Sequence, residues 1–204
     1  AFGKHVYPEW VETEGISDIS LDDVEAADSF GYVIKLIGSA KRLKNGKITA
    51  AVRPTLVSRE CILSGVNGVF NAITVTGDET GDVMFYGKGA GKNATASAVV
   101  ADIIDCAKHL DTRKYVFWDE GERSFVEAHS DEEERFFVRM LSDDYEQLEK
   151  QFEEYFKGAS VVKNRFRGEI SFLTAPVREN GLTEKLSRFK NIKAVKVLHT
   201  MGVN

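Results

Sequence analysis

Two segments in the first half of the chain have the hydrophobic spacing of helices. Ser20 followed by Asp23 is a capping-box pattern, which predicts a short helix from about Leu21 that ends at Gly31. Between residues 95 and 110, apolar residues recur at helical spacing and predict a second helix with one wide apolar band. A band of this width should pack against another part of the protein.

Between these helices, apolar runs separated by turn residues predict four strands. The runs 32–43 and 48–57 flank Asn45-Gly46, a strong signal for a tight hairpin turn. The runs 68–76 and 83–86 flank a second turn that is rich in glycine and polar residues. The sequence permits these strands to form one sheet.

From residue 135 onward the patterns follow the order strand, helix, strand, strand, helix, strand. This βαββαβ order is that of the ferredoxin-like fold, in which two helices cover one face of a four-stranded antiparallel sheet. Asp143 with Glu146 predicts the N-terminal cap of the first helix, and Gly158 ends it. The strands are expected at 136–141, 161–166, 169–174 and 192–199, and the helices carry Tyr145, Leu148, Phe152, Tyr155 and Phe156, then Leu182, Leu186 and Phe189.

An acidic stretch divides the two halves. Residues 119–134 contain Arg123 as their only basic residue among many acids, and we predict a linker there. The predicted organisation is therefore an α+β chain with a mixed or antiparallel sheet over 1–118, an acidic linker over 119–134 and a ferredoxin-like domain over 135–204. No apolar run is long enough to cross a bilayer and no secretory signal begins the chain, so we expect a cytoplasmic protein without a membrane partner.

Charge and cysteine content exclude several classes of function. A net charge of −5 argues against a nucleic-acid partner. Lys163, Arg165 and Arg167 alternate along a predicted strand and would place three positive charges on one face; protection of a sheet edge explains them better than nucleic-acid binding. Cys61 and Cys106 lack metal-ligand spacing and are predicted to be reduced, mostly packed thiols.

The four histidines form no recognisable catalytic or metal-binding constellation. His5, His109, His129 and His199 lie far apart in the sequence, and no nucleophile and base occur at a characteristic spacing. We assign them no role and expect no metal.

The strongest local signal for ligand binding lies in the stretch Tyr86 to Thr95, where three glycines join a predicted strand to a predicted helix. Glycine lets the backbone approach a ligand closely, and the first turn of a helix offers unpaired N–H groups and a partial positive charge. The full dinucleotide-binding spacing and its downstream acid are missing, so a plain tight turn explains the pattern alone better than a ligand site does.

Several specific segments occur in order along the first 110 residues and together resemble the catalytic domain of homoserine dehydrogenases. These segments are Glu14-Gly15-Ile16, Asp23-Val24 with Ala27, Phe30-Gly31-Tyr32-Val33-Ile34-Lys35-Leu36, Arg53-Pro54, Val69-Phe70-Asn71-Ala72, Tyr86-Gly87-Lys88-Gly89-Ala90-Gly91 and Thr95-Ala96-Ser97-Ala98-Val99-Val100-Ala101-Asp102.

The resemblance implies an activity. The family interconverts aspartate semialdehyde and homoserine with NAD or NADP, and an aspartate and a lysine act on the substrate in a segment that would precede Ala1, as would the Rossmann domain. The resemblance therefore implies a C-terminal fragment that is inactive alone, with no catalytic residue in this chain. It assigns cofactor contact to Gly91, with Gly89 and Ala90 as weaker companions, and leaves the choice between NAD and NADP open.

Residues 135–204 resemble an ACT domain, a module that commonly binds amino-acid effectors. The resemblance points to Asp143 and Leu148 at the effector turn and to threonine as the effector, but Glu146 stands where the family pattern has glycine. An equal alternative is that the ACT-like domain binds no effector and serves only in assembly. We expect the protein to form a homodimer or a higher homo-oligomer. The runner-up reading is a stand-alone amino-acid-binding regulator, and the third is a structural subunit without a ligand.

Overall fold

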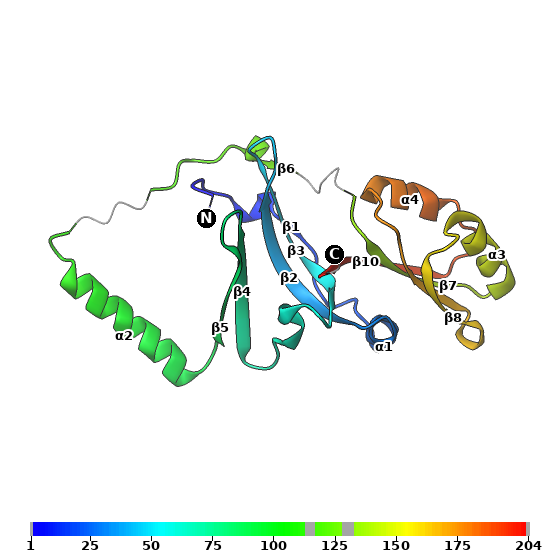
Figure 1. The fold of residues 1–204 in the computed structure, drawn as a ribbon, viewed down its shortest axis with the longest axis horizontal. Coiled ribbons are helices and arrows are strands. Elements are labelled where there is room, and N and C mark those ends of the chain that lie inside the picture. Colours follow the sequence, from blue (N-terminus) through cyan, green and yellow to red (C-terminus); the bar gives the residue numbers. More distant parts are fainter. Residues whose placement is uncertain (1, 113–116, 128–132, 203–204) are drawn as a thin grey trace. The chain divides into compact units, whose positions relative to one another are not determined.

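The computed structural model describes residues 2–112, 117–127 and 133–202. Its elements confirm the predicted α+β class with a mixed sheet. Within these ranges the helices are α1 (Leu21–Ser29), α2 (Lys92–Lys108), α3 (Tyr145–Tyr155) and α4 (Glu179–Ser187), with short 3-10 turns at Pro8–Trp10, Ile62–Gly65, Arg123–Phe125 and Arg165–Arg167. The strands are β1 (Glu12–Thr13), β2 (Tyr32–Arg42), β3 (Ile48–Ser58), β4 (Phe70–Gly77), β5 (Gly81–Lys88), β6 (Val126–Glu127), β7 (Phe136–Leu141), β8 (Ser160–Asn164), β9 (Glu169–Leu173) and β10 (Ala194–Met201) (Figure 1).

The chain divides into two compact units, and they do not follow the predicted boundary. One unit combines residues 1–61 with 119–204, and the other spans residues 62–118. The predicted division into 1–118 and 135–204 separates segments that share one sheet, because β10 pairs in parallel with β3. In the predicted linker, β6 also pairs with β3.

Strand β3 is the axis of the sheet in the first of these units. The predicted hairpin is confirmed, since β2 pairs with β3 in antiparallel register from Tyr32↔Ser58 to Arg42↔Ile48. The other edge of β3 is shared by three parallel partners, which are β6, then β1, then β10. The sheet thus joins the start and the end of the described chain.

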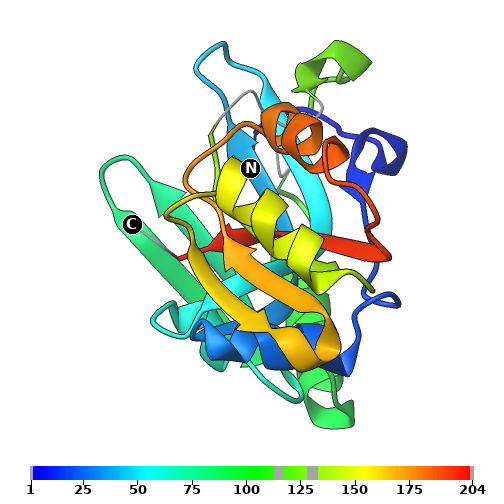
Figure 2. The same cartoon turned by 90° about the vertical axis from the view of Figure 1, so that its right-hand side faces the viewer.

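The predicted ferredoxin-like arrangement is confirmed for the second half of the chain. The strand order is β10-β7-β9-β8, and each neighbouring pair in it is antiparallel. Figure 1 shows α3 and α4 on the same side of these strands, and Figure 2 shows the β8–β9 hairpin in gold and β10 in red. We call β7 to β10 with α3 and α4 the ferredoxin-like layer.

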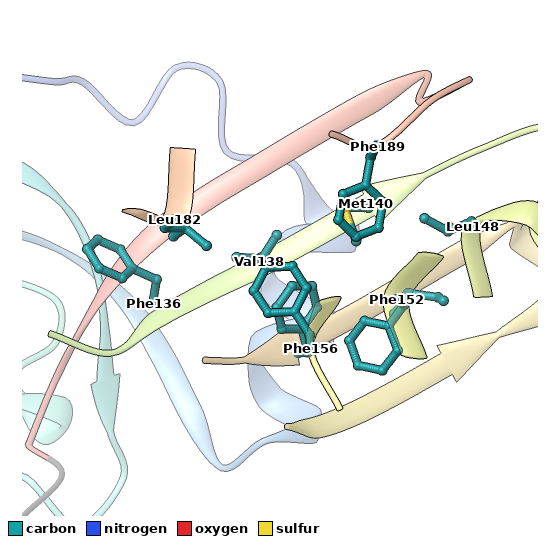
Figure 3. Packing of buried hydrophobic residues seen from close by; sticks show 10 residues of the cluster. Phe136, Val138, Met140, Leu148, Phe152, Phe156, Leu182 and Phe189 are labelled. Carbon is teal, nitrogen blue, oxygen red and sulfur yellow. The ribbon is translucent and has the colours of Figure 1, made fainter. Parts of the chain in front are cut away.

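The main core lies between this sheet and its two helices. Phe136, Val138 and Met140 occupy alternate positions of β7, so their side chains project from one face of the sheet. Leu148 and Phe152 of α3, Leu182 of α4, and Phe156 and Phe189, which follow the ends of these helices, are also buried in this cluster. Figure 3 shows these side chains gathered beside β7.

The opposite face of β7 is covered by α1. Phe137 packs there with Ala26 and Ala27 of the helix and with Leu56 of β3. The predicted capping box of α1 is present, since Ser20 and Asp23 bond to each other through both backbone and side chain. The ferredoxin-like layer therefore packs on both faces, once on its own helices and once on the N-terminal segment.

The unit of residues 62–118 has a different character. Strands β4 and β5 form the predicted hairpin but pair only with each other among the described residues, so they do not join β2 and β3 in the single sheet that the sequence permitted. Helix α2 starts earlier than predicted and buries none of its residues, which leaves its apolar band uncovered in the described chain. None of the described residues from 62 to 118 is buried.

The predicted basic face of Lys163, Arg165 and Arg167 is wrong. Strand β8 ends at Asn164, whose side chain accepts a hydrogen bond from the Arg167 backbone N–H, and Arg165–Arg167 is a 3-10 turn. The charges are instead paired with acids: Lys163 with Glu149 and Glu153, Arg165 with Glu146, and Arg167 with Asp22 and Glu25.

Candidate functional site

The predicted glycine-rich loop does join a strand to a helix. Strand β5 ends at Lys88 and α2 begins at Lys92, with Gly91 as its N-cap at φ 128° and ψ 141°. This φ lies in a region that L side chains rarely adopt, so glycine is required there by the backbone alone. A Cβ built on Gly91 would meet nothing within 4 Å, so the space above it is open within its unit.

Gly89 is required for a different reason. Its N–H donates to the carbonyl of Val69 at 3.2 Å, which holds the loop against the start of β4. A Cβ on Gly89 would overlap the side-chain amide of Asn71. Asn71 was not singled out from the sequence, although its pairing with Gly87 across the predicted hairpin could have placed it there.

The first turn of α2 is suited to a polar or anionic group. The first N–H groups of an α-helix have no acceptor within the helix, and no side chain caps them here. The first turn also contains no acidic residue, so the partial positive charge of the helix end is not offset locally. With Gly91 offering open space, the loop fits the approach of a nucleotide phosphate or ribose. Ala90 lies between the two glycines in this loop.

At the predicted effector turn, the structure does not bring Asp143 and Leu148 together on the surface. Leu148 is fully buried in the main core. Asp143 is exposed and paired with Lys193 at 3.2 Å, while Glu146 is paired with Arg165. The cap of α3 is Asp144 rather than the predicted Asp143, since the Asp144 carboxylate accepts a hydrogen bond from the Gln147 N–H at 3.0 Å.

A buried ion cluster, missed by the sequence analysis, links α1 to the ferredoxin-like layer. Arg139 of β7 donates to Asp23 at 2.9 Å and to Glu169 of β9 at 2.7 Å, and side-chain exposure is 8% for Arg139, 2% for Asp23 and 10% for Glu169. Asp22 lies at 3.4 Å from the same guanidinium. The sequence analysis gave Asp23 only a capping role, because nothing local signals a partner more than a hundred residues away.

The electrostatics of this cluster favour the charged form of Asp23. Burial raises the pKa of its carboxyl, but hydrogen bonds from Ser20 and Arg139, with the charge of Arg139, outweigh burial and hold the pKa below its usual value. The carboxylate is therefore an ion that its partners stabilise, and we assign it to structure because nothing places it at the glycine loop.

The other residues considered for chemistry lie apart. His5 packs edge-on against Tyr7, His109 lies beside Asp105, and His199 bonds to Glu134 at 3.0 Å; His129 lies outside the described residues. Across the described ranges no histidine, cysteine or acid cluster could hold a metal ion.

Both cysteines are free, but the expectation that they are packed is not met. Cys61 is half-buried and Cys106 is exposed on α2. None of the helices in the described ranges combines the length and the apolar composition that a bilayer crossing requires.

Together these observations define an α+β chain that contains a candidate polar ligand site, formed by a strand, a glycine loop and a helix, and a ferredoxin-like layer. Comparison with known proteins identifies this class. A sequence model described as homoserine dehydrogenase matches residues 1–104, about half of the chain. The chain belongs to the homoserine dehydrogenase family, a family of oxidoreductases.

Individual relatives support the same assignment. The chain is 47% identical over 108 residues to a homoserine dehydrogenase of Helicobacter pylori, covering 53% of this chain and 25% of that protein. It is 44% identical over 110 residues to the homoserine dehydrogenase of Pseudomonas aeruginosa, covering 54% and 25%. The matched part of the chain thus spans about a quarter of the length of these relatives.

Solved structures extend the likeness to the whole chain. A crystal structure of S. aureus homoserine dehydrogenase at pH 6.0 matches with a TM-score of 0.75 at 30% identity, covering 100% of this chain and 50% of the other. The homoserine dehydrogenase from Thiobacillus denitrificans matches with a TM-score of 0.72 at 25% identity, covering 98% and 49%. The ferredoxin-like layer is therefore included in the likeness.

Proposed function

We propose that this chain is part of an NAD- or NADP-dependent homoserine dehydrogenase, which interconverts aspartate semialdehyde and homoserine. The observation that carries this proposal is the family match over residues 1–104, which contains the whole loop from Lys88 to Lys92. Because the family match covers residues 1–104 and not the ferredoxin-like layer, it favours a dehydrogenase over a stand-alone amino-acid-binding regulator. The cytoplasmic location expected from the sequence goes with this proposal.

Within that enzyme, we assign the glycine loop to the cofactor. When bound, a nicotinamide cofactor supplies the hydride acceptor or donor. Gly91 lets a polar part of the cofactor approach the backbone, and the first N–H groups of α2 face the negative charge of the cofactor. Gly89 and Ala90, both small residues, form the rest of the loop between β5 and α2. The aspartate and lysine that act on the substrate are proposed to lie outside residues 1–204, in keeping with the share of the relatives that the chain spans.

The ferredoxin-like layer is proposed to be an ACT-like regulatory domain, and threonine is the effector to test first. Its sheet order supports the domain type. A homodimer or higher homo-oligomer is proposed as well. It is supported by the exposed apolar residues of the β4–β5 hairpin and α2, among them Ile73, Phe85, Ile103 and Ile104.

The activity is tested on the full-length protein that contains this chain. We expect it to oxidise homoserine with NAD or NADP, and we expect residues 1–204 alone to show no turnover. Activity of the isolated 204-residue chain would overturn the placement of the substrate-acting residues, and no activity of the full-length protein would overturn the function itself.

The role of the loop is tested by Gly91→Ala in the full-length protein. The new methyl group points into open space but forces the backbone out of φ 128°, so we expect the KM for the cofactor to rise about tenfold, the effect of losing roughly 1.4 kcal/mol of binding. The matched control is Gly46→Ala, which has φ 82° and equally open space but lies in the β2–β3 turn. An equal change in both variants would show that the loop has no special role.

A further inference from the structure

The ferredoxin-like layer contains a pocket of about 490 Å³. The pocket lies at one end of the layer. Because β9 is antiparallel to both β7 and β8, this end contains the first residues of β7 and β8 and the last residues of β9, together with the last residues of α3, which lead into β8. Residues from these four places line the pocket, together with Lys185 of α4. The turn after β7, which carries Asp143, lies at the opposite end of the layer, so the pocket is separate from the predicted effector turn.

The charges around the pocket are all of one sign. Arg135, Lys157 and Lys185 line it, and no acidic residue does. The whole chain has 32 acidic against 27 basic residues, so a lining of this kind runs against the average surface. Converging charges of one sign in a concave site raise the local concentration of counter-ions.

These three cations also have no partner of opposite charge among the described residues. Four other cations of the same layer, Lys163, Arg165, Arg188 and Lys193, each form an ion pair with an acid, but they lie outside the pocket. The ammonium of Lys185 lies 5.7 Å from the centre of the Phe156 ring, a cation–π contact that holds the charge at the pocket without neutralising it. An anion bound here would relieve the mutual repulsion of the three cations.

The rest of the lining sets the size and type of the anion. Tyr155, Phe156 and Val177 provide apolar surface, and a volume of this size suits a small organic molecule rather than a bare ion. A zwitterionic amino acid fits poorly, because its ammonium group would meet three cations and no carboxylate. A compact organic molecule with two negative charges fits both the positive charge of the pocket and its apolar surface.

We propose that this pocket binds a small organic dianion, either a phosphate monoester or a dicarboxylate. The site is independent of the proposed dehydrogenase function, since it uses none of the residues of the glycine loop. Two negative charges are the chemistry common to both ligand types, and the choice between them is left to the probes.

The test is calorimetric titration of the full-length protein at pH 8 with phenyl phosphate, a monoester that carries an apolar group, and, separately, with succinate. We expect saturable binding of at least one of them. Binding of phenyl phosphate alone would identify a phosphate-monoester site, binding of succinate alone a dicarboxylate site, and binding of both a general dianion site. L-Threonine competing for the same site, or no saturable heat from either anion, would overturn the proposal.

The double variant Lys157→Gln/Lys185→Gln localises the binding. Removing two charge-assisted hydrogen bonds should weaken it about tenfold or more. Lys150→Gln/Lys190→Gln carries the same change of charge on exposed lysines outside the pocket and should bind as the unaltered protein does. Thermal melting verifies that both variants fold, and equal weakening in the two would show that only net charge matters, which would overturn the site.

Discussion

The ferredoxin-like layer and the unit of residues 62–118 use similar amphipathic patterns and reach opposite outcomes. In the layer, alternate residues of β7 are buried on both faces, by α3 and α4 on one side and by α1 on the other. In the other unit, the β4–β5 hairpin and α2 carry comparable apolar residues, yet Ile73, Phe85 and Ile103 are each more than 60% exposed.

The difference teaches that a local pattern specifies an element and its apolar face but not what covers that face. Burial needs a second surface, and β7 has two of them within the described chain. Exposed apolar surface on the scale seen in residues 62–118 marks interaction sites in proteins. Substitutions matched in residue type can therefore measure how far the two regions differ.

The largest effect is expected from Arg139→Ala. This change leaves Asp23 and Glu169 buried without their partner, and breaking such a buried ion pair costs about 3–5 kcal/mol in the free energy of unfolding. Arg165→Ala is the control from the same layer, where the ion pair with Glu146 is about 70% exposed on both sides and should contribute at most about 1 kcal/mol. Urea denaturation measures both. Similar losses would mean that position in the layer matters and burial does not.

The next effect compares two isoleucines in strands. Ile170 of β9 is fully buried and Ile73 of β4 is 67% exposed. We expect Ile170→Ala to lower the free energy of unfolding by about 2–5 kcal/mol and Ile73→Ala by less than about 1 kcal/mol. If Ile73→Ala proves as costly in the 204-residue chain, the hairpin is covered in solution and the contrast between the regions fails.

A smaller difference is expected between two glycines of nearly equal conformation. Gly168 has φ 66° and Gly81 has φ 65°. Alanine at either position strains the backbone by about 1–2 kcal/mol, but at Gly168 its Cβ would also overlap the carbonyl oxygen of Ser142, whereas at Gly81 it meets nothing within 4 Å. Gly168→Ala should therefore lower the melting temperature clearly more than Gly81→Ala, and equal shifts would refute the packing difference.

The smallest expected effect is the change, between neutral and acid pH, in the free energy that the Asp23 carboxylate contributes to folding. The folded-state pKa of Asp23 is lowered, so its carboxylate stabilises the fold fully above the unfolded-state pKa of about 3.9, and this contribution is lost as the pH falls through the folded-state pKa. Unfolding free energies of the unaltered protein and of Asp23→Asn should therefore differ most near neutral pH and converge below about pH 4. A difference that stays constant down to pH 2 would contradict the shift.

Much of the secondary structure followed from the sequence, because its signals are local. Ser20 and Asp23 bond as the capping-box pattern predicts, and Asn45-Gly46 forms the turn between β2 and β3. The turn after β8 was missed. The alternating charges of Lys163, Arg165 and Arg167 are typical of a strand, but Asn164 caps a 3-10 turn at this point. The order of elements was enough for the ferredoxin-like arrangement, since that fold has few alternatives.

The pairing of distant segments could not be predicted. Nothing near Thr55 signals that His199 will lie beside it in a parallel pair, and nothing near Asp23 signals Arg139. For the candidate site, the glycine loop was visible as a local motif, but the approach of Asn71 to Gly89 needed the hairpin register. The basic pocket could not be predicted from the sequence, because Arg135, Lys157 and Lys185 lie far apart along the chain.

The parallel pairing of β10 with β3 has a consequence for biosynthesis. On the ribosome, β3 emerges before β10, so the edge of β3 that β10 completes must wait until residue 201 has been made. During that interval its peptide groups at Thr55 to Val57 face solvent or a chaperone, and non-local strand pairing of this kind closes slowly. The yield of correctly folded protein should therefore depend on the synthesis rate and the chaperone supply as well as on the stability of the finished sheet.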